Sequence, residues 1–219
     1  MRVLDSERMG EAGFELPIFE LPLVLLPGEL MPLHIFEDRY KRMIDHCVTD
    51  SEPFGVVFRD DEGGARRIGC EARVTEVTER FDDGRLNIIV TGERPFSVLD
   101  RYEGSGYPAG EVEAVEAGAS ADEDAAAGAA ARDAFAELVR RVGADAPERD
   151  ELDSLDAYGL AGRVELPAET KQRLLELRSE PERMRVLAAA LGTLVDTVAR
   201  SREIADRARM NGKLIVGDA

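Results

Sequence analysis

Four side chains in the sequence have the chemistry of soft-metal ligands: His34, His46, Cys47 and Cys70. Structural zinc sites bring four such ligands together from closely spaced pairs. His46 and Cys47 are neighbours in a predicted helix, where adjacent side chains point about a third of a turn apart and do not face one ion together. The pattern predicts no metal site and no cofactor. We expect the two cysteines to be buried as small hydrophobic side chains, with reactive thiols as the alternative.

No activated nucleophile or phosphate-binding loop is evident. The nearest glycine-flanked serine, in Gly104-Ser105-Gly106, lacks the G-x-S-x-G spacing of a nucleophile elbow. Gly212-Lys213 is followed by leucine, where a Walker A sequence has serine or threonine. Carboxylates are so numerous that any two could be paired as acid and base, so their presence indicates nothing without geometry. We therefore predict that the chain is not an enzyme.

The excess of acidic residues limits the classes of partner that we expect the chain to bind. The 219 residues contain 45 acidic and 28 basic side chains, for a formal net charge of −17. Such a polyanion repels phosphate backbones and anionic lipid surfaces, so we expect neither a nucleic-acid partner nor a membrane partner. The most apolar stretch, residues 16–36, contains four prolines, which would leave backbone groups unsatisfied in lipid.

The two cysteines and the first thirteen residues indicate the cellular compartment in which we expect to find the protein. Two cysteines without a framework of spacings fit a reducing cytoplasm better than a secreted disulfide scaffold. The first thirteen residues mix acids and bases and lack the apolar centre of a signal peptide. We expect a cytoplasmic protein.

The chain changes character near Gly118, which predicts a β-rich part over residues 1–118 and a helical part over residues 119–219. One helix is expected in the first part, over residues 37–50, with an apolar stripe at helical spacing. The other segments of the first part alternate or are bounded by proline and glycine, as strands are. The predicted extended segments are residues 16–26, 30–35, 54–58, 68–74, 86–91, 95–102 and 107–115.

A linker is expected over residues 116–128, followed by a helix over residues 129–142 that Gly143 ends. A short helix is expected over residues 152–160. Two further helices are expected to start at Pro167 and at Ser179, where proline, acidic residues and a capping serine occupy the preferred positions.

The first part resembles the amino-terminal substrate-binding domain of Lon proteases, mainly through the string LPIFELPLVLLPGELMPLHIFEDRYKRMI. The matching positions there are Leu16, Pro17, Phe19, Leu21, Pro22, Leu25, Pro27, Gly28, Pro32, Leu33, Ile35, Phe36, Glu37, Arg39, Tyr40 and Met43. Further matches lie in residues 54–57, 69–72, 83–87 and 92–96. The pieces LPAETKQRLLEL and PERMRVLAAAL are similar to the carboxy-terminal helices of that domain.

The resemblance implies an α+β fold, with a curved β-sheet or partly open barrel of PUA-like type followed by an α-helical bundle. It also implies the recognition role of the Lon domain without proteolysis, since no ATPase or peptidase sequence follows within the 219 residues. The implied partners are client proteins or peptides, with a protease or an adaptor as a further candidate. The oligomeric state stays open.

Four residues are candidates for client binding: Phe19, Leu25, Met31 and Phe36. They flank the Pro27-Gly28 turn, and methionine adapts to varied partners. Because side chains alternate along a strand, the four cannot all share one face, and some must belong to the core. The alternative is a small-ligand-binding protein or an enzyme, with a pocket between the β part and the bundle lined by His34, Glu37 and Arg39.

Overall fold

The structure is a computed structural model, and it describes residues 13–116, 118, 125–145 and 147–212. The chain forms two compact units. The first comprises Met1–Gly118 and Ala161–Arg178, and the second comprises Ala119–Leu160 and Ser179–Ala219. Each unit is described by itself below. No helix among the described residues combines the length and apolar character needed to cross a bilayer.

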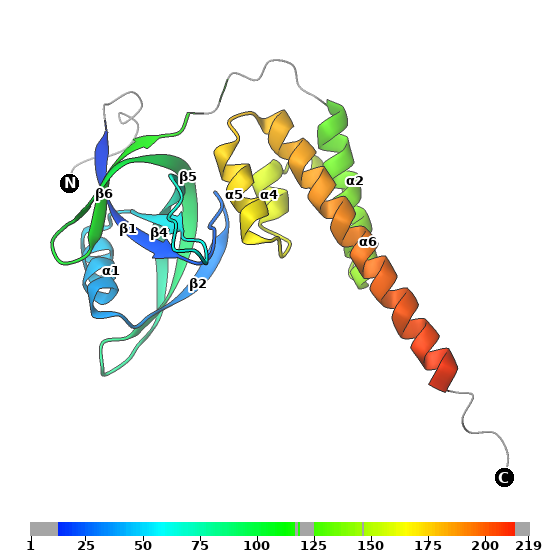
Figure 1. Ribbon diagram of the computed structural model, residues 1–219, viewed down its shortest axis with the longest axis horizontal. Coiled ribbons are helices and arrows are strands. Elements are labelled where there is room, and N and C mark those ends of the chain that lie inside the picture. The colour runs from blue at the N-terminus through cyan, green and yellow to red at the C-terminus, as the bar shows by residue number, and fades with distance from the viewer. Residues whose placement is uncertain (1–12, 117, 119–124, 146, 213–219) are drawn as a thin grey trace, which may run out of the picture. The chain divides into compact units, whose positions relative to one another are not determined.

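A mixed six-stranded sheet forms the body of the first unit (Figure 1). Its strands are β1 (Phe14–Leu21), β2 (Leu30–Ile35), β3 (Phe54–Phe58), β4 (Ile68–Arg80), β5 (Leu86–Glu103) and β6 (Pro108–Ala114). The order is β2-β5-β4-β3-β1-β6, and only the β1–β3 pair is parallel. This confirms the expected α+β fold with a curved sheet.

The curvature comes from β5, which is long enough to pair with three strands. Its first part lies between β2 and β4, and its last part, from Phe96 to Glu103, pairs with β6. The sheet therefore curls back on itself along β5, and β2 is left at the open end with one partner. We expected two strands here, over residues 86–91 and 95–102. The structure joins them, and Pro95 is accommodated beside a register shift in β4, the position at which a sheet tolerates proline.

The inside of the curved sheet is filled by side chains from several strands. One buried cluster consists of Leu16, Ile18, Val57, Phe96, Val98 and Val112. Helix α1 (Asp38–Asp50) packs against the sheet through the predicted stripe, of which Tyr40, Met43, Ile44 and Cys47 are buried. The expected turn at Pro27-Gly28 is present, and Gly28 and Gly84 have φ of 75° and 83°, values that glycine adopts readily.

Helix α5 (Ala168–Glu176) belongs to the sheet unit and not to the helical unit. Lys171 forms an ion pair of 2.5 Å with Glu29, and the buried Gln172 side chain donates to the Ile68 carbonyl at 3.0 Å. Our expected division into residues 1–118 and 119–219 therefore differs from the observed units over residues 161–178. The polar contacts that hold this segment to the sheet join residues more than a hundred positions apart.

The second unit is built on two long helices, α2 (Ala125–Val142) and α6 (Glu180–Gly212), which lie side by side (Figure 1). Ala131, Phe135 and Leu138 of α2 are buried, as are Leu187 and Leu191 of α6. Two short helices, α3 (Arg149–Asp153) and α4 (Ala157–Ala161), follow α2 in the chain. Helix α2 ends before Gly143, which has φ of 86°, as the sequence predicted. The residues 117 and 119–124 of the expected linker lie outside the described residues.

Candidate peptide-binding site

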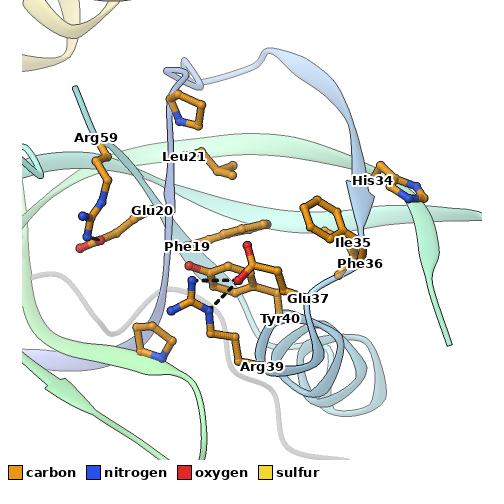
Figure 2. A pocket seen from close by; sticks show the side chains of 12 residues that line it. Phe19, Glu20, Leu21, His34, Ile35, Phe36, Glu37, Arg39, Tyr40 and Arg59 are labelled. Atoms are coloured by element: carbon orange, nitrogen blue, oxygen red, sulfur yellow. Dashed lines mark hydrogen bonds and ion pairs between the residues drawn. The ribbon is translucent and has the colours of Figure 1, made fainter. Parts of the chain in front are cut away.

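A hollow of about 590 Å³ in the first unit lies between β1 and the junction of β2 with α1 (Figure 2). The strand that carries Phe19 and Leu21 forms one side, and the segment from His34 to Tyr40 forms the other. The lining residues are Phe19, Glu20, Leu21, Pro22, His34, Ile35, Phe36, Glu37, Arg39, Tyr40, Arg59 and Pro108. We call this hollow the β1–β2 pocket.

Aromatic side chains form the floor of the β1–β2 pocket. Phe19 and Tyr40 are both buried, and their ring centroids are 4.1 Å apart. Phe54 lies behind Phe19, at 6.3 Å between centroids. Burial raises the pKa of the Tyr40 hydroxyl above its ordinary value, so this side chain is a neutral hydrogen-bonding group at physiological pH. The floor is therefore aromatic and uncharged.

Charged side chains at the rim of the pocket neutralise one another. Arg59 pairs with Glu20, which also lies 3.5 Å from Arg101. Arg39 pairs with Glu37 at 2.9 Å, and the Arg39 guanidinium carbon lies 4.6 Å from the Tyr40 ring centroid. Because each acid is matched by a base, the rim adds polarity to the pocket without giving it a strong charge.

Phe36 stands exposed at the edge of the pocket, with 60% of its surface accessible. His34 stacks on it with a centroid distance of 6.0 Å and meets Phe81 edge-on at the same distance. The His34 Nδ1 atom lies 2.6 Å from Oδ1 of Asn87, whose amide donates to Glu79 at 2.9 Å. The hydrogen bonds hold the imidazole in place, and the imidazole in turn supports an aromatic ring that faces solvent.

The structure separates the four candidate client-binding residues. Phe19 and Phe36 line the β1–β2 pocket together, one as buried floor and the other as exposed edge. Leu25 is only 1% exposed and belongs to the core. Met31 is half-buried on β2 and does not line the pocket. An exposed apolar residue that we did not single out is Leu30, at 66%. The alternation of β2, with Leu33 and Ile35 facing inward, is the signal that predicts it.

His34, Glu37 and Arg39, proposed for an alternative ligand site, do meet around one hollow. That hollow lies within the first unit, since all of its lining residues belong to it. Glu37 and Arg39 are occupied with each other, and His34 is hydrogen-bonded to Asn87. Nothing in this arrangement presents a nucleophile beside a base, which is what covalent catalysis requires.

The two cysteines are free and buried. Burial, with a contribution from Glu52, raises the pKa of the Cys47 thiol to about 12. Burial likewise raises the pKa of Cys70 far above its ordinary value. Both are therefore protonated at neutral pH and unreactive, in keeping with a packing role. Among the described residues no three His, Cys, Asp or Glu side chains converge in a way that would hold a metal ion.

Comparison with known proteins places this architecture in a family. The model of the ATP-dependent protease La (LON) substrate-binding domain matches residues 15–191. The chain therefore belongs to the Lon substrate-binding domain family, as its sequence resemblance predicted. The matched region is the substrate-binding domain of that protease and not a catalytic one.

Two similar proteins are Lon proteases. The one from Paraburkholderia phytofirmans is 27% identical over 201 residues, covering 83% of this chain and 24% of its own length. The one from Anaeromyxobacter dehalogenans is 29% identical over 195 residues, covering 81% of this chain and 23% of its own. The chain thus spans about a quarter of these relatives.

Solved structures agree on the fold. A Lon N-terminal domain protein from Xanthomonas campestris is 27% identical, with a TM-score of 0.63 over 80% of this chain and 98% of that one. The N-terminal domain of a Mycobacterium avium complex Lon protease gives a TM-score of 0.66 over 81% and 98%. At 23% identity, the second comparison supports the fold alone.

Proposed function

We propose that this chain is a non-catalytic protein-binding module that holds exposed apolar segments of client proteins, or of an adaptor partner, at the β1–β2 pocket. The observation that carries the proposal is the exposed Phe36 ring beside an apolar floor of Phe19 and Tyr40. Large aromatic residues are usually buried, and an exposed aromatic at a concave site is typical of protein recognition.

Membership of the Lon substrate-binding family supports this assignment. A balanced rim and an apolar floor favour unfolded or extended segments over a charged small molecule. The buried, protonated thiols support action in a reducing compartment, and we propose the cytoplasm. A separate protease that receives the client remains part of the proposal.

The test uses reduced and carbamidomethylated lysozyme, an unfolded basic protein, as the client. Phe36→Ser should weaken its binding by about fivefold or more, since an interface residue that matters contributes more than about 1 kcal/mol. Leu99→Ser is the matched control, because Leu99 is an exposed apolar residue of the same unit outside the pocket. Its affinity should equal that of the parent.

Both variants should melt within a few degrees of the parent, because Phe36 and Leu99 are 60% and 43% exposed and neither belongs to the core. Equal binding of lysozyme by the parent and the folded Phe36→Ser variant would place the site elsewhere.

A further inference from the structure

Strand β2 exposes an unusual row of side chains. Its residues alternate, with Leu30, Pro32 and His34 exposed and Leu33 and Ile35 buried. The exposed row continues into Phe36. Strands at the edge of a sheet usually carry charges that prevent pairing with another chain. This edge strand has no charged residue at these positions, and two of the residues are large and apolar.

The hydrogen bonds between the start of β2 and Gly92 of β5 establish which peptide groups of the two strands face one another. The Gly92 N–H donates to the Glu29 carbonyl at 3.0 Å, and the Gly92 carbonyl accepts from Gly28 at 2.8 Å. Both polar groups of Gly92 therefore face the β2 side. Because peptide groups alternate along a strand, those of Val90 and Ile88 face β2 as well.

The remaining residues of β2 must therefore point their peptide groups away from β5. In the antiparallel register Leu30, Pro32 and His34 lie opposite Thr91, Ile89 and Asn87. The carbonyls of Asn87 and Ile89 accept hydrogen bonds from threonines of β4 on the other side, at 3.1 Å each. The row of Leu30, Pro32 and His34 therefore forms the unpaired edge.

Pro32 supports the same orientation of the β2 peptide groups. Pro32 has no N–H, and proline within a sheet is confined to positions where that group would face solvent. The unpaired edge thus offers the N–H and carbonyl of Leu30, the carbonyl of Pro32, and the N–H and carbonyl of His34. In the described part of the chain β2 pairs with β5 alone.

We propose that the client segment binds by adding to this edge of β2 as an extended strand. The inference rests on the proposed function and specifies its mode. His34 belongs both to the unpaired edge and to the wall of the β1–β2 pocket, which Ile35 and Phe36 continue. A strand running along β2 therefore brings one of its alternate side chains to the pocket, beside Phe36. Backbone hydrogen bonds supply affinity and the pocket supplies selection.

The occupant is a client polypeptide and not a second copy of this chain. A row of peptide groups repeated every second residue is complementary to another extended backbone. Two copies that each carry a net charge of −17 repel one another, whereas a neutral or basic segment is attracted. We therefore expect alternating apolar side chains with basic residues at the ends of the bound segment.

The experiment uses the fluorescein-labelled peptide Lys-Val-Thr-Leu-Ser-Phe-Thr-Val-Lys and a series in which one backbone amide at a time is N-methylated. N-methylation removes a donor without changing the side chain. Strand addition predicts a period of two, with affinity reduced about tenfold at alternate positions and much less at the positions between them. Side-chain capture alone predicts no such period.

A protein variant tests the same contact from the other side. Pro32→Ala introduces an N–H on the unpaired edge, so the peptide should bind about 2- to 10-fold more tightly. His34→Pro removes an N–H from that edge, so it should bind the peptide more weakly than His34→Ala, which loses the same imidazole and keeps the N–H. Melting of each variant establishes that it folds, and the N-methyl series on the unchanged protein does not depend on that outcome.

The outcomes separate the two proposals. A period of two in the methylated series supports strand addition. A flat series, or failure of the peptide to bind, overturns strand addition alone if lysozyme still binds through Phe36. If the unchanged protein binds neither lysozyme nor the peptide, the proposed function and this inference are overturned together. Dimerisation of the chain through β2 without peptide binding overturns the choice of occupant.

Discussion

Strands β2 and β3 are both short and apolar, and they have opposite roles in the molecule. β3, with the sequence FGVVF, lies between β1 and β4, and all five of its residues are buried. β2, with the sequence LMPLHI, pairs with β5 alone among the strands that the structure describes, and it buries two of its six residues. The number of neighbouring strands, more than hydrophobicity, decides whether an apolar residue becomes core or surface.

Phe54 and Phe36 illustrate the consequence. Phe54 starts β3 and is fully buried, whereas Phe36 follows β2 and is 60% exposed. Burial of the first stabilises the fold, because apolar surface is removed from water. Exposure of Phe36 leaves an apolar ring available for contact with another molecule. Four measurements test this contrast.

The largest effect is expected from Phe54→Ala. The side chain is fully buried and packs near Phe19, so its removal leaves a cavity in the centre of the sheet. The free energy of unfolding should fall by about 3 to 5 kcal/mol. Urea denaturation followed by circular dichroism measures this loss. A loss below about 1 kcal/mol would mean that β3 is not the rigid centre that its burial indicates.

Ile35→Ala tests the two faces of β2. Ile35 is 1% exposed, and its truncation should cost about 2 to 4 kcal/mol by the same measurement. Leu30→Ala in the same strand is the control and should change the free energy of unfolding by less than about 0.5 kcal/mol, because Leu30 is largely exposed. Equal losses for the two variants would contradict the alternation of β2.

The buried thiols predict a loss of stability at high pH. Cys70 pairs across from Val56 of β3, and Cys47 lies on the buried face of α1. Burial raises both pKa values above the ordinary thiol value near 9, to about 12 for Cys47. Below pH 9 each thiol is protonated whether the chain is folded or unfolded. Above it only the unfolded chain releases the proton, so folding becomes less favourable.

The free energy of unfolding should therefore fall between pH 9 and pH 10 by on the order of 1 kcal/mol for each thiol. Urea titrations at several pH values measure the slope. The double variant Cys47→Ala/Cys70→Ala retains the other titrating groups and should show a shallower dependence. If the parent and the double variant show the same dependence on pH, the thiols are accessible to solvent in the folded chain.

The smallest expected effect is that of Pro32→Ala on stability. The new amide faces away from β5 and breaks no existing hydrogen bond. Loss of the proline ring frees the unfolded chain, so the expected cost is about 0.4 to 1 kcal/mol. Hydrogen exchange should show the new amide exchanging much faster than those of Leu33 and Ile35, which face β5. Protection of the new amide in the absence of peptide would mean that this edge is already paired.

Local patterns in the sequence were enough to predict most of the helices and strands. β2 and β3 have the predicted boundaries, α1 begins within a residue of its predicted start, and α5 and α6 begin where proline and serine indicated. Periodicity and chain-breaking residues act over a few positions, so one sequence can express them. The same proline and glycine spacing carried the family resemblance, which the comparison confirmed.

Local patterns thus predicted most of the elements, the class of fold and the family. Tertiary structure alone decided that β5 continues through Pro95, that α5 joins the sheet unit, and that Leu25 is core while Phe36 is exposed. It also decided that Phe19 and Phe36 share one pocket. Each of these outcomes depends on contacts between residues far apart in the chain. Local propensity does not encode such contacts, because the burial of an apolar side chain depends on which strands and helices come to lie beside it.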